Sequence, residues 1–217
     1  MMRTEYNEKL KGLKVKLLKM GSMVQEIVQE AMQALLSQDI EKAHRIHLLD
    51  DRIDEIELDI EKECMNLIAL QQPMARDLRT IGTILKAITD LERMGDYAVN
   101  IARQTELIGE DPFIKPLVDI PRMARLSEDM IAKCLDAFVK EDVDLAREVA
   151  HDDDAVDEIY ELIYVELIEM MIHDQKIIKQ AINLLLIGRY LERIADHATN
   201  IGERVIYMVT GEQVKIN

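Results

Sequence analysis

Apolar residues recur at three- and four-residue steps along most of the chain. The stretch from Met23 to Leu35 has this spacing, and the stretch from Ile84 to Ile101 repeats it. Such a period places apolar side chains on one face of a helix, whereas a half-buried strand would alternate them at every second residue. The pattern therefore predicts amphipathic helices throughout, and an all-α fold.

Helix-breaking and capping residues divide this pattern into segments. Six long helices are predicted, at residues 5–37, 39–70, 74–109, 118–140, 142–172 and 175–209. Asp39 and Asp142 are expected to be N-caps, because a short carboxylate accepts the free amide hydrogens of a first helical turn. Pro73 suits the first position of the third helix, and Gly211 suits the end of the last one.

The two halves of the chain resemble each other. At an offset of 100 residues, the run at 91–101 shares Leu, Glu, Arg, Asp, Ala, Asn and Ile with the run at 191–201. Earlier segments align at an offset of 103, which indicates a three-residue difference in one loop. An internal duplication predicts two similar, pseudo-symmetric three-helix bundles in tandem. We expect the first repeat to span residues 1–110 and the second 117–217, with the break near residues 109–117.

Pairs of acidic residues occupy the same positions in both repeats. Glu92 and Asp96 are four residues apart, so their side chains project from one helix face about one turn from each other. Like charges at this spacing repel, and four such pairs need a common explanation. The eight acids are Asp50, Asp54, Glu92, Asp96, Asp153, Asp157, Glu192 and Asp196.

The heights of these pairs along their helices match. Helices joined by a short loop pack antiparallel, so residues equally far from the turn lie side by side. The midpoints of the two pairs differ by about 3 Å in the first half and about 1.5 Å in the second. We therefore predict that four carboxylates meet in each half and bind a cation, because their repulsion would otherwise be unrelieved. Ordinary ion pairs with Arg52, Arg93 and Arg193 are the alternative, but they do not explain the repetition.

The type of donor atom limits which metals are candidates. Carboxylate oxygens, with no cysteine and no repeated histidine, favour a divalent metal such as Mg²⁺, Mn²⁺ or Ca²⁺, or iron, over structural zinc. The only cysteines, Cys64 and Cys134, lack the spacing of a zinc ribbon or a redox motif and are expected to be reduced core residues.

Composition limits the partners and the location. The 217-residue chain has a formal net charge of -15, which disfavours nucleic acid and suits cations or basic protein surfaces. Residues 1–8 contain no apolar signal core, and no segment approaches the roughly 18 apolar residues of a spanning helix. We expect a cytoplasmic protein. A nucleophile elbow, a phosphate-binding glycine loop and a Ser/His/Asp set are all missing from the sequence, which argues against an enzyme.

Two other interpretations stay open. Glu41 with His44, and Glu148 with His151, have the Glu-x-x-His spacing of di-iron bundles. The duplication does not preserve them, since Glu41 aligns with Asp144. A carboxylate-bridged, di-iron-like metalloenzyme is therefore the alternative, and a metal-free helical scaffold is a third possibility.

Three runs resemble the PhoU family of phosphate-uptake regulators: residues 91–96, their copy at 191–196, and the sequence QPMARDLR at 72–79. The resemblance covers nearly the whole chain and includes the two-repeat layout. It implies a homodimer of two-bundle subunits that binds divalent metals or iron clusters through the eight acids.

The resemblance also implies a function. Members of the family act as negative regulators that link the phosphate ABC transporter, through its ATPase subunit, to a sensor histidine kinase. Such a protein would be peripheral to the membrane only through its partners. The second repeat has Lys176–Lys179 in place of the corresponding part of the QPMARDLR run, so any role of Arg76, Asp77 and Arg79 is confined to one repeat.

Overall fold

The computed structural model describes residues 2–71 and 73–216, and within these residues it contains helices and no strands. The all-α prediction is confirmed. The elements are α1 (Met2–Ser37), α2 (Ile40–Arg45), α3 (His47–Gln71), α4 (Ala75–Ile108), α5 (Asp119–Lys140), α6 (Val143–His173), the short 3₁₀ helix η1 (Gln175–Ile177) and α7 (Ile178–Thr210).

The capping predictions hold at three of four positions. Asp39 accepts a hydrogen bond from the Lys42 amide at 2.8 Å, and Asp142 caps α6 in the same way. Gly211 ends α7 with a φ of 81°. Pro73 was wrongly placed inside a helix: α4 begins only at Ala75, with Met74 as its extended N-cap residue. Proline has a fixed φ that suits an extended lead-in equally well.

The second predicted helix is interrupted, which the periodicity did not reveal. The Ile46 amide donates to the Ala43 carbonyl oxygen at 3.1 Å, a tight turn that separates α2 from α3. Ala43 and Ile46 are both buried, so the apolar stripe continues across the break. The pattern of apolar positions alone therefore predicts one helix where the structure has two, α2 and α3.

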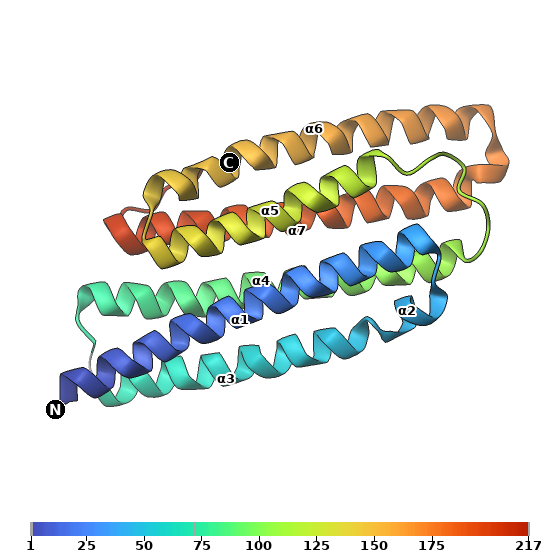
Figure 1. Cartoon of the computed structure of the whole chain (residues 1–217). Coiled ribbons are helices and arrows are strands. Elements are labelled where there is room, and N and C mark those ends of the chain that lie inside the picture. The colour runs from blue at the N-terminus through green and yellow to red at the C-terminus, as the bar shows by residue number, and fades with distance from the viewer. Residues whose placement is uncertain (1, 72, 217) are drawn as a thin grey trace.

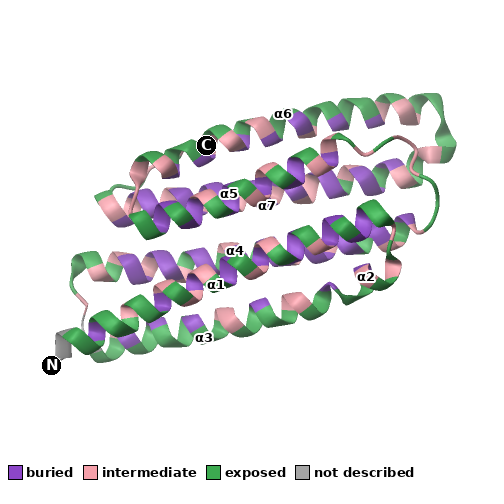
Figure 2. Ribbon diagram, in the orientation of Figure 1, coloured by how far each residue is buried: buried purple, intermediate pink, exposed green. Residues whose placement is uncertain are grey.

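The helices form two three-helix bundles that lie side by side (Figure 1). α1, α3 and α4 make the first bundle, with α2 packed on α4, and α5, α6 and α7 make the second. α4 packs along α7, and α1 also contacts α5, so the inner faces join the bundles. Figure 2 shows buried residues along these inward faces and exposed ones on the outer sides. The tandem two-bundle prediction is thus confirmed, whereas the repeat boundaries at 110 and 117 stay a prediction.

Close contact between α1 and α5 depends on a glycine. A Cβ atom built on Gly21 would lie 2.1 Å from Cδ1 of Leu135, far inside van der Waals contact. The Leu135 side chain of α5 therefore packs directly against the α1 backbone, in space that a side-chain carbon at position 21 would occupy.

The connection from residue 109 to 118 is held by two glutamines. Gln38 donates from Nε2 to the carbonyl oxygens of Gly109 and Asp111 at 2.9 and 2.8 Å. Gln180 accepts a hydrogen bond from the Ile114 amide at 2.6 Å. These bonds satisfy backbone groups of the irregular segment and fix its path between the bundles.

The arginines of the QPMARDLR run contact the other repeat. Arg76 forms an ion pair with Glu141, to which Lys14 also donates at 3.3 Å. Arg79 donates from Nε to the Met208 carbonyl oxygen at 3.2 Å, near the C-terminal end of α7. These contacts fasten the first bundle to the second, and only the first repeat supplies them from this run.

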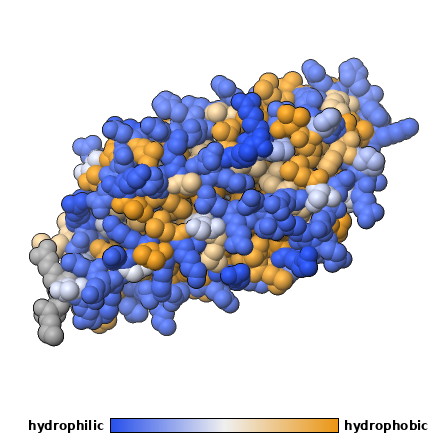
Figure 3. Space-filling view, in the orientation of Figure 1, coloured by the Kyte–Doolittle hydropathy of each residue, from blue (hydrophilic) through white to orange (hydrophobic). Residues whose placement is uncertain are grey.

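The surface is mostly polar, with separate apolar patches on the face seen in Figure 3. Of the helices formed by residues 2–71 and 73–216, none has both the length and the apolar composition needed to cross a membrane. Cys64 and Cys134 are buried free thiols, as predicted.

Candidate metal centre

The first acidic cluster lies between α3 and α4, which pack against each other. Asp50 and Asp54 come from α3, and Glu92 and Asp96 from α4. Burial, followed by the negative charges of Asp54, Asp96 and Glu92, raises the pKa of Asp50 to about 7. Asp96 likewise raises the pKa of Asp54 after burial does. The two pairs are thus close enough to repel each other, as their matched heights predicted.

Asp50 is the inner member of this cluster and lies against the backbone of α4. A Cβ atom on Gly95 would be 2.6 Å from Asp50 Oδ1, so the carboxylate occupies space that a side chain at position 95 would take. This Oδ1 atom is buried and has no hydrogen-bond partner. Asp54, by contrast, is exposed and opens the cluster to solvent. An unsatisfied buried carboxylate oxygen is unfavourable, and a bound cation would relieve it.

The second cluster repeats this arrangement between α6 and α7. Asp153 is only 1% exposed, and burial, followed by the charges of Asp157 and Asp196, raises its pKa to about 7. Glu192 is 9% exposed, and its pKa is raised by burial and then by Asp196. Asp157 is the exposed member, in the place of Asp54. Two separate sites therefore share one electrostatic pattern.

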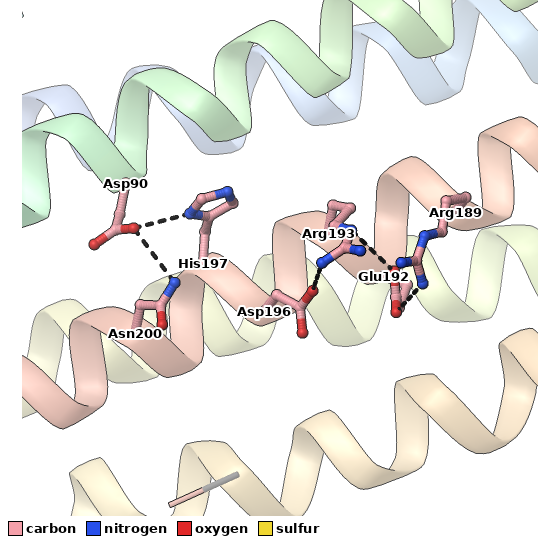
Figure 4. A network of polar contacts seen from close by, with 7 residues as sticks. All are labelled: Asp90, Arg189, Glu192, Arg193, Asp196, His197 and Asn200. Atoms are coloured by element: carbon pink, nitrogen blue, oxygen red, sulfur yellow. Dashed lines mark hydrogen bonds and ion pairs between the residues drawn. The ribbon is translucent and has the colours of Figure 1, made fainter. Parts of the chain in front are cut away.

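Arginines distinguish the two clusters. In the first, Arg93 lies 3.6 Å from Glu92 and 3.5 Å from Asp96. In the second, Arg193 lies 2.8 Å from Asp196, and Arg189 forms a further ion pair with Glu192 (Figure 4). The second cluster is accordingly the better neutralised of the two.

Two residue changes between the repeats explain why the second cluster is better neutralised, and the search for shared residues did not detect them. Arg189 aligns with Thr89 of the first repeat, and Tyr160 aligns with Glu57. Burial raises the pKa of Glu57, and the charge of Asp54 adds to the effect, so Glu57 acts as a fifth acid beside the first cluster. In the second repeat the Arg189 guanidinium instead lies 5.9 Å from the Tyr160 ring centroid. Comparing the repeats for charge changes, and not only for identities, would have found these residues.

The carboxylate oxygens of each cluster are suitable ligands for a hard cation. The side chains do not, however, form a complete coordination sphere. Within the described residues, no group of three or more His, Cys, Asp or Glu side chains lies close enough to hold a metal ion. The carboxylates are near enough to repel, so rotation about their side-chain torsions is what binding would require. The prediction that all eight acids are metal ligands stays a prediction.

The Glu-x-x-His motifs lie apart from these clusters, on the surface. His44 and Glu148 have side-chain exposures of 62% and 61%. His44 lies 2.8 Å from Glu106, and Glu148 lies 3.8 Å from Lys133. A di-iron enzyme needs such residues to point into the bundle, and these do not.

A polar contact joins the two repeats where α4 meets α7. His197 Nδ1 lies 2.8 Å from Asp90 Oδ1, as Figure 4 shows. At the offset of 100, Asp90 aligns with Tyr190, and His197 with Tyr97. The rings of Tyr97 and Tyr190 stack with their centroids 6.0 Å apart. The interface therefore has pseudo-two-fold symmetry, with an acid–histidine pair on one side and two tyrosines on the other.

Comparison with known proteins agrees with this architecture. The PhoU domain family matches residues 17–105 and 120–205. The chain is 40% identical to the phosphate-specific transport system accessory protein PhoU homolog of Clostridium acetobutylicum, over the full length of both. The homolog from Aquifex aeolicus is 42% identical over 96% of this chain and 94% of its own.

Solved structures show the same fold. The crystal structure of PhoU from Pseudomonas aeruginosa superimposes with a TM-score of 0.91 at 38% identity, covering 95% of this chain and all of that one. The phosphate transport system regulatory protein PhoU from Streptococcus pneumoniae gives 0.90 at 34% identity, covering 96% of this chain and 99% of its own. Given these matches across both repeats, the chain belongs to the PhoU family.

Proposed function

We propose that this protein is a metal-binding, cytoplasmic regulator of phosphate uptake that acts through protein contacts and not through catalysis. Its relatives are named as accessory proteins of the phosphate-specific transport system, which supports a regulatory role. The observation that carries the metal half of the proposal is the duplicated carboxylate cluster. Asp50 and Asp153, at equivalent positions, both have a pKa raised to about 7 by burial among acids.

In each repeat, the inner aspartate and its three neighbouring acids would hold the ion. Asp50, Asp54, Glu92 and Asp96 would do so in the first repeat, and their four counterparts in the second. A bound divalent cation or iron supplies positive charge that offsets the repulsion of the carboxylates. The acids would then connect α3 firmly to α4, and α6 to α7, and so set the shape of the outer surfaces. Regulation needs no chemical step in this scheme.

Metal analysis tests this half of the proposal. Protein purified without a chelator and without a histidine tag should contain a stoichiometric metal, or bind Mn²⁺ or Fe²⁺ in a calorimetric titration. The variant Asp96→Asn/Asp196→Asn should lose this binding, because each cluster then lacks one charged ligand. A matched control is Asp51→Asn/Asp154→Asn, which changes two exposed neighbours. Equal metal content in all three proteins would refute the metal site.

The partner half of the proposal concerns negative regulation. We propose contacts with the ATPase subunit of the phosphate ABC transporter and with a sensor histidine kinase, made by a homodimer at the membrane surface. Cells that lack this protein should express phosphate-starvation genes even when phosphate is abundant, and the parent chain should restore repression. Co-purification from phosphate-replete cells, with and without added Mn²⁺, should recover both partners. An unchanged starvation response in the deletion strain would contradict this half alone.

A further inference from the structure

An open groove runs between α1 and α3 in the first bundle. It encloses about 550 Å³. Leu13 and Leu67 line it and are only 1% and 3% exposed, while Leu70 at its edge is 74% exposed. Gly12 also lines the groove, and a Cβ atom built there would meet nothing within 4 Å. The groove therefore combines an apolar floor with free space above a helix backbone.

The corresponding position in the second bundle is filled by the chain itself. At the offset of 103, Gly12 aligns with Lys115, Lys16 with Asp119, and Glu63 with Glu166. Lys115 forms an ion pair with Glu166 and lies 4.0 Å from Asp119, and its side chain is only 17% exposed. The pocket around Lys115 holds only about 10 Å³. The connector thus covers in the second bundle a place that stays open in the first.

The α1 side of the groove carries concentrated positive charge. Residues 9–25 contain five lysines and no acidic residue, although the whole chain has a net charge of -15. Lys9 and Lys16 line the groove, whereas Lys14 pairs with Glu141 of the second bundle. Lys16 is engaged with Asp59 and with Glu63, the latter at 2.9 Å, whereas Lys9 pairs only with exposed Glu5. A second pocket of about 300 Å³ continues the groove past Lys16.

Lys19 lines this second pocket and makes no ion pair with any residue in the described part of the chain. The open sites for a ligand carboxylate are therefore at Lys9 and Lys19, at either side of the Lys16 bridge. Such a charged wall attracts and orients an acidic partner.

We propose that the α1–α3 groove binds an acidic amphipathic helix of a partner protein. The two pockets extend along α1 from Lys9 to Met23, about 21 Å at the helical rise, which matches one face of a helix of four turns. Apolar residues at spacings of three and four would lie on Leu13 and Leu67, and acidic residues would face Lys9 and Lys19. This inference rests on one part of the proposed function, namely that the protein acts through protein contacts. It does not depend on metal binding.

The charge of the other wall argues against an anionic membrane as the occupant. Three acids, Glu55, Asp59 and Glu63, line the α3 side with one base, Arg52, so this wall is net negative and would repel acidic lipid headgroups. A helix is narrow enough to present its acidic side to α1 and a neutral or basic side to α3.

Two glycine substitutions provide a matched test. Gly12→Trp places an indole over the groove floor, and Gly82→Trp places one on α4, where a Cβ atom also meets nothing within 4 Å. Tryptophan is a better helix former than glycine, so neither variant should lose stability. Unfolding in urea verifies this before any binding measurement.

The probe is a displayed library of 16-residue peptides with helical apolar spacing and randomised polar positions, selected on the parent protein. Enriched peptides should be acidic and should bind Gly12→Trp about tenfold more weakly than the parent or Gly82→Trp. Lys9→Glu/Lys19→Glu should weaken binding, and added salt should do the same.

Several results would overturn the proposal. They are failure to enrich any peptide, enrichment of basic peptides, and equal binding to Gly12→Trp. Loss of a dimer in Gly12→Trp by sedimentation would identify a second copy as the occupant instead, and binding of anionic vesicles that Gly12→Trp abolishes would identify a membrane. The variant Asp96→Asn/Asp196→Asn should still bind the peptide. Such binding would show that the groove proposal holds even if the metal proposal fails.

Discussion

Replacement of Asp50 by asparagine should stabilise the metal-free protein, and increasingly so as the pH rises. Burial and the charges of Asp54 and Asp96 raise the pKa of Asp50 from 3.8 to about 7. An acid of this kind holds its proton more tightly in the folded chain than in the unfolded one. Its contribution to stability is therefore complete below the unfolded pKa and is lost as the pH rises toward the folded pKa.

The size of the effect follows from the pKa difference. A shift of about three units costs the folded protein about 4 kcal/mol at about pH 8, where the buried carboxylate is ionised. At about pH 5 the cost is less than half as large, because that pH is only about one unit above the unfolded pKa. Asparagine is uncharged at both values. The stability gained by Asp50→Asn should consequently grow by about 2 to 3 kcal/mol between them.

Urea unfolding in EDTA at the two pH values measures this difference, and comparing pH values cancels the hydrogen bonds that asparagine itself makes. Glu55→Gln is the control, since Glu55 is an exposed acid on α3 that is not among the charges raising the pKa of Asp50, and its substitution should leave the pH profile close to that of the parent. With excess Mn²⁺ the order should reverse, because an ion bound to the folded state favours the charged ligand. A pH profile for Asp50→Asn that matches the parent would refute the reasoning.

Three further substitutions test other features. Gly21→Ala should destabilise the protein by about 1 to 3 kcal/mol in thermal unfolding, because its methyl group would overlap the Leu135 side chain; an unchanged Tm would show that this side chain can move aside freely. Arg189→Thr should strengthen Mn²⁺ binding to the second cluster in calorimetry by removing a competing positive charge, and weaker binding would contradict this role. Arg79→Ala should cost about 1 kcal/mol in urea unfolding through loss of its bond to the Met208 carbonyl, whereas an equal or higher stability would argue against that contact.

The local sequence pattern was sufficient to predict much of the fold. Apolar spacing located the helices, and the caps at Asp39 and Asp142 lie where short carboxylates were expected. The duplication established two bundles. The break at Ile46 escaped notice because its buried side chain keeps the stripe intact, and Pro73 was misplaced because proline suits either side of a helix start.

Contacts between the repeats could not be predicted in this way. Periodicity says which face of a helix is buried but not which helix covers it, so the packing of α4 along α7 was not foreseen. For the candidate site, equal distance from the turn correctly placed Asp54 near Asp96. It did not indicate that Asp50 would be an inner acid or that Arg189 would neutralise one cluster, since both depend on neighbours from another element.

The contact between α4 and α7 shows a consequence of having both repeats in one chain. In a dimer of separate identical subunits, any substitution at the symmetry axis appears twice, so both sides of the axis must tolerate it. Here a change at Asp90 alters the acid–histidine pair without substituting either tyrosine of the symmetry-related pair. The two repeats can therefore specialise independently while the shared architecture keeps them aligned.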